Sequence, residues 1–175
     1  MASAQKISNL YGNLSYFLNS SDEFGTTSVS IGDLDGDGVQ DIVVGADQDN
    51  DGGNDAGAVY ILFLTTNGLV KTAQKISNSY GGLSSFYILE KEAEFGWAAD
   101  SLGDLDGDDV VDLVVGAWSD DDGANSAGAV YVLFMNTNAT VKSAQKISNS
   151  YGSLTYTIGS YDRLGKWYLL LFLVQ

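Results

Sequence analysis

The strongest constraint on the fold of this chain is an internal repeat. The hexapeptide AQKISN begins at Ala4, Ala73 and Ala144. Three further motifs recur 71 residues apart: EFG at Glu23 and Glu94, GDLDGD at Gly32 and Gly103, and AGAVY at Ala56 and Ala127. A chain with such a period builds supersecondary units that bury their apolar faces only against their neighbours. The repeat therefore predicts stacked copies of one unit.

Each unit reads as short strands separated by glycine, asparagine and aspartate, with no sustained helical periodicity. Residues 41–46 form an expected buried strand, and residues 58–64 are apolar on both faces, so we expect cover on two sides. Residues 70–77 suit an outer strand guarded by Lys71 and Lys75. These features predict an all-β chain: a partial β-propeller of about two and a half four-stranded antiparallel blades.

The repeat also sets expected boundaries. We expect residues 1–23 to be the end strand of a preceding blade and a linker, 24–94 the first blade, 95–165 the second, and 166–175 a truncated third blade with an apolar tail. In the third copy Leu164 and Gly165 take the places of Phe24 and Gly25, but no acidic loop follows. Propellers close with about four to eight blades. Further blades of a longer parent chain, or self-association, would therefore be needed for closure.

Composition excludes several classes of function. The chain has 8 basic and 23 acidic residues, and its net charge of -15 disfavours nucleic acid as a partner. It has no histidine and no cysteine, which removes imidazole triads, soft-metal centres and disulfides. The first residues do not read as a signal peptide. The apolar run at 167–174 is too short to span a bilayer, so no membrane insertion is expected.

Two aspartate-rich loops are the candidate sites. Carboxylates about 4 Å apart repel by roughly 4 kcal/mol per pair at an effective dielectric constant near 20. Turns that point the aspartates into solvent are one alternative. Calcium is the favoured one, because it binds hard oxygens at positions 1, 3, 5 and 9 and a carbonyl at position 7 of such a loop. The predicted ligands of two Ca²⁺ ions are Asp33, Asp35, Asp37, Val39 and Asp41 in the first loop, and Asp104, Asp106, Asp108, Val110 and Asp112 in the second.

Position 6 of such a loop needs a left-handed backbone, and it is Gly38 in the first copy and Asp109 in the second. Neither loop is an EF-hand, because position 12 is Val44 or Val115 in place of glutamate. A further acidic stretch, residues 47–55, has similar spacing, but its counterpart at 118–126 does not. We interpret it as a solvated hairpin loop, with a weak extra cation site as the alternative.

These residues resemble a known family. Phe24 and Gly25, the DxDxDGxxD loop, and Gly45 with Ala46 resemble the FG-GAP repeat of integrin α-subunit β-propellers and of other surface proteins. The resemblance implies that each repeat is one blade and that a calcium loop joins its first two strands. It also implies an extracellular or cell-surface platform that binds a protein or glycan ligand. The proline of the family motif is replaced by Asp47 and Trp118.

The resulting hypothesis is a calcium-binding repeat module for extracellular recognition or cell adhesion, with no catalytic residues and no cofactor besides Ca²⁺. The alternative is an accessory propeller domain of a secreted hydrolase or lyase that acts on carbohydrate or lipid. Its candidate acids would be Glu23, Glu90, Glu92 and Glu94. A purely structural repeat is a third possibility that the sequence does not separate from the first.

Overall fold

Two four-stranded antiparallel sheets make up the architecture, each with its strands in chain order. The computed structural model describes residues 4–166. The first sheet contains β1 (Ser28–Gly32), β2 (Asp41–Ala46), β3 (Ala58–Leu64) and β4 (Val70–Ile76). The second contains β5 (Phe95–Gly103), β6 (Asp112–Ala117), β7 (Ala129–Met135) and β8 (Val141–Ile147). Among the described residues only η1, a 3₁₀ turn at Leu83–Ser85, is helical, so the predicted all-β partial propeller is confirmed.

The central strands bury both of their faces. In the first sheet Val43 pairs with Ile61, and Val44 pairs with Tyr60. The first pair joins a core that continues into the second sheet, whereas the second pair belongs to a separate core on the opposite face. Successive residues of a strand point to opposite faces, so one apolar run serves two cores. The expected cover on two sides is confirmed.

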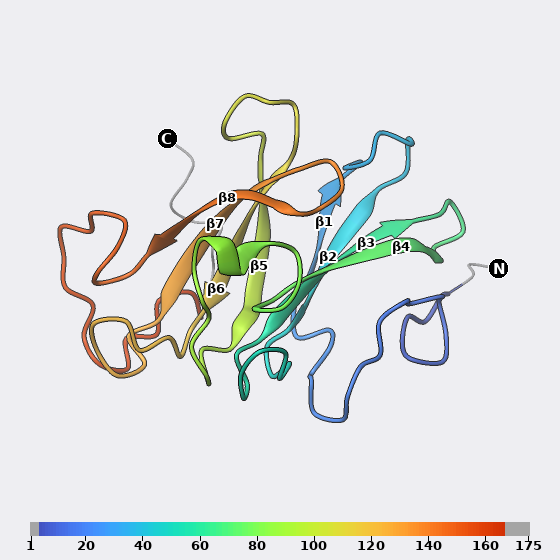
Figure 1. The fold of residues 1–175 in the computed structure, drawn as a ribbon. Helices are drawn as coiled ribbons and strands as arrows, with labels where there is room; N and C mark the ends of the chain where they lie inside the picture. The colour runs from blue at the N-terminus through green and yellow to red at the C-terminus, as the bar shows by residue number, and fades with distance from the viewer. Residues whose placement is uncertain (1–3, 167–175) are drawn as a thin grey trace.

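The second sheet covers one face of the first. Strand β5 lies against β1 and β2, and Figure 1 shows the two sheets side by side with β5 between them. On the opposite face of the first sheet, residues 4–27 provide the cover. The rings of Tyr16 and Phe24 pack edge-on against buried Tyr60, with centroids 5.5 and 5.4 Å away. The second unit repeats this arrangement: Tyr87, in the connection after β4, and Phe95, at the start of β5, pack edge-on against buried Tyr131.

The expected end strand within residues 1–23 is not formed in its described part, residues 4–23. The same AQKIS sequence in β4 pairs with β3, from Val59 with Ile76 to Leu62 with Ala73. No described strand lies before the first copy, so residues 4–23 have no ladder to join in this structure.

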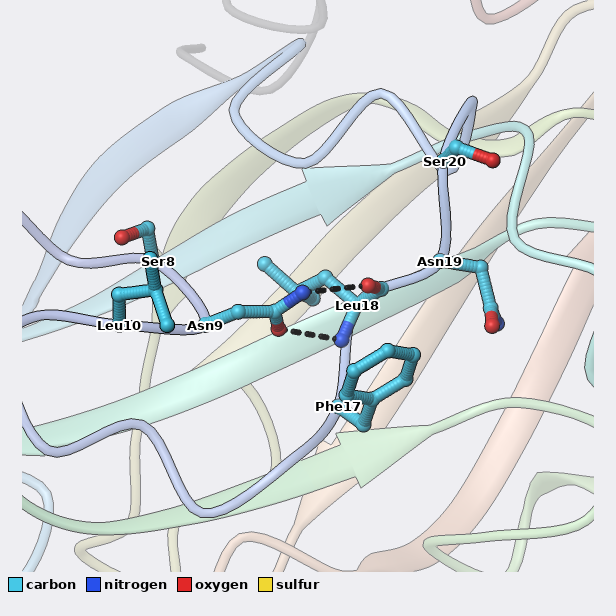
Figure 2. A pocket seen from close by; sticks show the side chains of 7 residues that line it. All are labelled: Ser8, Asn9, Leu10, Phe17, Leu18, Asn19 and Ser20. Carbon is cyan, nitrogen blue, oxygen red and sulfur yellow. Dashed lines mark hydrogen bonds between the residues drawn. The ribbon is translucent and has the colours of Figure 1, made fainter.

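An asparagine side chain pins each of these covering segments. Figure 2 shows Asn9 and the Leu18 backbone joined by two hydrogen bonds of 2.6 Å: the Asn9 amide donates to the Leu18 carbonyl, and the Leu18 N–H donates to the Asn9 side-chain oxygen. The same pair of bonds joins Asn78 to Leu89 and Asn149 to Ile158. The third copy therefore repeats the asparagine contact of the first two.

Glycine pairs set the distance between successive units. A Cβ atom on Gly45 would lie 2.0 Å from the carbonyl oxygen of Gly96, which is the glycine of the next EFG motif. A Cβ on Gly116 would lie 2.1 Å from the carbonyl oxygen of Gly165. No side chain fits at either place, so the two backbones touch directly.

Hydrogen bonds beside these glycines join the backbones of successive units. The Phe95 N–H donates to the Ala56 carbonyl at 3.1 Å, and the Leu164 N–H donates to the Ala127 carbonyl at 2.8 Å. Each contact continues as a short parallel bridge to the following glycine, Gly57 or Gly128. The start of the third unit is thus docked on the second sheet in the register that the second unit has on the first.

The outer face of the second sheet is less covered than its counterpart. Ile61 and Phe63 of the first sheet are buried, whereas Val132 and Phe134, at the equivalent positions, are only half-buried. The chain up to residue 166 forms no third sheet on this face. The predicted apolar tail of a truncated third blade, residues 167–175, lies outside the described residues. In the described part, no helix has the length and apolar character needed to span a membrane.

Substitution of Gly45 by alanine is expected to destabilise the chain, because the new Cβ would overlap the Gly96 carbonyl. Overpacking of this kind typically costs about 1 to 3 kcal/mol. The midpoint of urea unfolding measures the effect. Gly53→Ala is the matched control, because Gly53 does not have a left-handed φ and the nearest atom to its Cβ would be 3.2 Å away. Equal midpoints for the two variants would contradict the proposed role of the contact.

Candidate metal centres

The aspartate-rich loops join the first two strands of each sheet. Asp33, Asp35 and Asp37 follow β1, and each places a carboxylate oxygen within 4.8 Å of the other two. Asp104, Asp106 and Asp108 repeat this arrangement after β5. Two oxygen ligands of one calcium ion lie at most about 5 Å apart, since each Ca–O distance is about 2.3–2.6 Å. The spacing of these carboxylates therefore fits calcium.

The first aspartate of each loop shapes the turn. The Asp33 carboxylate accepts the N–H groups of Asp37 and Gly38, at 2.9 and 2.7 Å. In the second loop Asp104 accepts three N–H groups, from residues 107 to 109. The backbone at position 6 is left-handed in both copies, with φ of 86° at Gly38 and 65° at Asp109. This feature of the loop was predicted from the sequence and is confirmed.

The fourth aspartate of each loop lies apart from the other three. Asp41 is buried, and its two carboxylate oxygens accept the N–H groups of Leu34 and Leu64, both at 3.0 Å. Burial raises the pKa of Asp41, the two N–H groups oppose that rise, and the neighbouring acids Asp35 and Asp37 add to it. Through these two hydrogen bonds Asp41 links the loop to the end of β3.

Asp112 makes the equivalent contacts in the second unit, accepting the N–H groups of Leu105 and Met135 at 2.9 and 3.0 Å. The remaining predicted ligands, the carbonyls of Val39 and Val110, sit in the same turns. The N–H groups of these two residues donate to Asp37 and Asp108. Coordination by either carbonyl stays a prediction.

A lysine from the outer strand reaches into each loop. The Lys71 ammonium contacts Asp35 at 2.6 Å and also Asp37. Lys142 contacts Asp106 and Asp108 at 2.7 and 2.5 Å. The hydrogen bond from Lys71 lowers the pKa of Asp37, and the bonds to Asp35 and Asp37 raise the pKa of Lys71.

Sequence reasoning assigned Lys71 only to edge protection. The sequence does carry a signal for the contact with the loop, because Lys71 and Lys142 occupy the same position in the two repeats. Both lysines and their partners are partly exposed, so water screens these pairs. A metal ion would have to displace the ammonium group from the oxygens that it shares.

The acidic stretch at 47–55 is not the solvated loop that we expected. Asp47 and Asp49 are buried, and Asp49 accepts the Lys75 ammonium at 2.8 Å and the Tyr60 hydroxyl at 2.8 Å. Lys75 also contacts Asp51 at 3.2 Å and is itself buried, so it is not an exposed edge lysine. The side chains turn inward because lysine and tyrosine satisfy the buried carboxylate.

The second unit builds the same buried cluster from Asp120, Asp122, Tyr131 and Lys146. Repetition of the cluster at both places identifies it as part of the fold. In each copy one lysine faces two aspartates, and the tyrosine hydroxyl donates to the more buried of the two.

The candidate acids of the enzyme alternative do not gather in a hollow. Glu23, Glu90 and Glu92 are exposed, and Glu94 is half-buried and accepts the Trp118 indole N–H at 2.5 Å. A surface hollow of about 680 Å³ lies on the N-terminal segment (Figure 2). It is lined by Ser8, Asn9, Leu10, Phe17, Leu18, Asn19 and Ser20, none of which is ionisable.

Two matched four-stranded sheets, each with an aspartate-rich loop between its first two strands and a glycine contact to the next unit, define a β-propeller repeat module. Residues 25–62, from the first EFG motif into β3, match the family model of the FG-GAP repeat. The chain thus carries the FG-GAP repeat that its motifs indicated.

The relatives are integrin α subunits. The chain is 36% identical over 112 residues to integrin alpha-PS2 of Drosophila melanogaster, covering 60% of this chain and 7% of the relative. It is 31% identical over 132 residues to integrin alpha-2 of Bos taurus, covering 68% and 10% respectively. A similar match, 36% over 96 residues, covers 54% of this chain and 7% of integrin alpha pat-2 of Caenorhabditis briggsae. The chain is similar to these integrin α subunits and spans about a tenth or less of their length.

Replacement of Asp112 by alanine is expected to destabilise the chain even when calcium is chelated, because two backbone N–H groups lose their acceptor. The Met135 N–H is buried, and a buried donor left unpaired costs about 1 to 3 kcal/mol, whereas water can reach the exposed Leu105. Urea unfolding in EGTA measures the loss. Asp106→Asn, at an exposed position of the same loop, should leave unfolding in EGTA nearly unchanged. Equal losses in the two variants would show that Asp112 has no structural role of its own.

Replacement of Lys71 by methionine is expected to tighten calcium binding at the first loop. The ammonium group competes with any cation for the oxygens of Asp35 and Asp37. Isothermal titration of calcium into the two proteins compares their affinities. Lys91→Met removes the same unit of charge from an exposed position of the connection between the sheets and is the control. Unchanged or weaker binding in Lys71→Met would rule out competition.

Proposed function

We propose that this chain is a calcium-binding β-propeller repeat module for extracellular protein recognition or cell adhesion, without catalytic activity. Its blades are proposed at 24–94 and 95–165. The observation that carries the proposal is the carboxylate triad that recurs at the same place in both units. The similarity to integrin α subunits supports a role of the adhesion type and an extracellular or cell-surface location.

The proposed role of calcium is structural. Three partly exposed carboxylates face a single ammonium group in each loop, so negative charge remains in excess. A divalent ion would balance this charge and fix the loop that joins the first two strands. Extracellular calcium modules bind with dissociation constants of about 10⁻⁴ to 10⁻³ M, which suits a site loaded outside the cell and vacant in low calcium.

The proposed partners are a protein or glycan ligand and further propeller blades. The net charge of -15 argues against nucleic acid. The half-covered outer face of the second sheet needs a neighbour, since repeat units bury their faces only by stacking. Blades of a longer parent chain or a second copy of this chain would supply it.

Calcium is expected to raise the melting temperature. At a tenfold excess over the dissociation constant, each site would add about 1.4 kcal/mol. Two sites would then raise the melting temperature of a chain of this size by roughly 5 to 10 °C. Thermal unfolding followed by circular dichroism, in EGTA and in increasing calcium, measures the shift. Magnesium should shift it less, because it demands a tighter octahedral geometry.

The double variant Asp33→Asn with Asp104→Asn is the control, and its calcium-dependent shift should be lost. An equal shift in this variant, or none in the natural sequence, would overturn the proposed calcium loops.

Recognition is tested by binding of the same two proteins to glycan arrays and to immobilised matrix proteins. Binding that needs calcium and is lost in the double variant supports the proposal. Turnover of a glycan or lipid would favour the enzyme alternative.

A further inference from the structure

A second group of acids lies where the first unit meets the second. Its members are Glu23, Asp47, Asp55 and Glu94, and none of them belongs to the aspartate-rich loops. The backbones of two of them touch, because the Glu94 N–H donates to the Asp55 carbonyl at 3.1 Å. Glu94 is the first residue of the second EFG motif, Asp47 follows Ala46, and Asp55 precedes Ala56. These three residues therefore lie beside the contact between the units.

Asp47 is the centre of this group, and it is poorly satisfied. It is fully buried, and its Oδ2 atom has no hydrogen-bond partner among the described residues. The Thr26 hydroxyl donates to its Oδ1 atom at 2.5 Å, and the same hydroxyl lies 2.8 Å from the Glu23 carbonyl. A hydroxyl has a single hydrogen to donate. Buried carboxylates are normally paired with a cation or several donors, so the Oδ2 atom of Asp47 is unsatisfied.

The surroundings of Asp47 add negative charge. Burial raises the pKa of Asp47, the Thr26 hydroxyl opposes the rise, and Glu23 and Asp55 add to it. Burial also raises the pKa of Glu94, where the Trp118 indole has the opposing effect and Asp47, Asp55 and Glu23 increase the pKa further. The four acids therefore lie close enough to repel one another.

The junction after the second unit is built differently. Trp118 replaces Asp47, Ser126 replaces Asp55, and Arg163 takes the position of Glu94. The Arg163 guanidinium lies 4.7 Å from the centre of the Trp118 ring, and the Lys166 ammonium lies 4.3 Å from it. The chain supplies its own cations at the second junction, whereas at the first it supplies four acids.

We propose that Glu23, Asp47, Asp55 and Glu94 bind a hard divalent cation of calcium size at the junction between the two units. The donors are carboxylates, the Thr26 hydroxyl and the Glu23 carbonyl, which are oxygen ligands that suit calcium and not a soft metal. No three of these carboxylates lie within 4.8 Å of one another, unlike those of the loops, so binding requires the acid side chains to move together, the exposed Glu23 among them. This ion would hold the second unit on the first.

The ligands differ from those of the weak site considered for residues 47–55. Asp49 and Asp51 are committed to Lys75. The two ends of that stretch are left: Asp47, and Asp55, whose carboxylate accepts the Asn54 amide at 3.0 Å and whose carbonyl accepts the Glu94 N–H. The competing explanation for Asp47 is a bound proton. Asparagine imitates the protonated acid, so substitution separates the two.

The number of calcium ions bound per chain, measured by equilibrium dialysis with ⁴⁵Ca²⁺, tests the proposal. The natural sequence should bind three ions, Asp47→Asn two, and Asp33→Asn with Asp104→Asn one. Glu94→Gln, at a half-buried position, should also bind two ions. This variant replaces Asp47→Asn in the experiment if Asp47→Asn does not fold. Glu92→Gln, an exposed acid two residues away, should still bind three.

A third ion that survives in Asp47→Asn or Glu94→Gln would overturn the proposal, and so would the absence of any ion in the loop double variant. If Asp47→Asn gains stability without changing the number of ions, Asp47 carries a proton instead. Failure of the calcium loops gives a different pattern: a single ion in the natural sequence that disappears in Asp47→Asn.

Discussion

Direct backbone contact between successive units is the constraint on which the rest of this structure depends. Gly45 meets Gly96, and Gly116 meets Gly165, at distances that exclude any side chain. This contact brings β5 against β1 and β2 and so closes the core between the two sheets. The motif that gives the repeat its recognisable sequence is therefore the place where one unit docks on the next. The aspartate-rich loops lie beyond it, at the other end of the same strands.

The acidic side chains of this chain lie in three different electrostatic settings. In the loops, Lys71 and Lys142 reach across from the outer strands to partly exposed aspartates. In the turns after β2 and β6, a buried lysine pairs with two aspartates, and a tyrosine hydroxyl donates to the buried one. At the junction between the units, Asp47 has no such partner. Two of the three arrangements repeat in both units, and the third marks where the copies diverge.

Much of the fold could be predicted because it depends on local pattern. Every residue of the strand at 58–64 is apolar, which predicts a strand with two apolar faces, and both faces are covered in the structure. Spacing of the loop aspartates, with glycine or aspartate at position 6, predicted the left-handed turn that Gly38 and Asp109 adopt. The AQKIS motif lies in a strand at its second and third occurrences but not at its first, since a strand needs a neighbouring strand as well as a suitable sequence. Residues 4–23 lack that neighbour and form an irregular cover instead.

The sequence by itself determined the repeat, the strand pattern and the two loops that gather three carboxylates each, because these follow from residue spacing along a short stretch of backbone. Only the tertiary structure decided which charges meet. Lys75 turned out to be buried with Asp49, and Lys71 to contact the first loop. Asp47 lies near Glu94 of the next unit with one carboxylate oxygen unsatisfied. The physical reason is that pairing of charges depends on distances across strands and between sheets, which no spacing along the chain specifies.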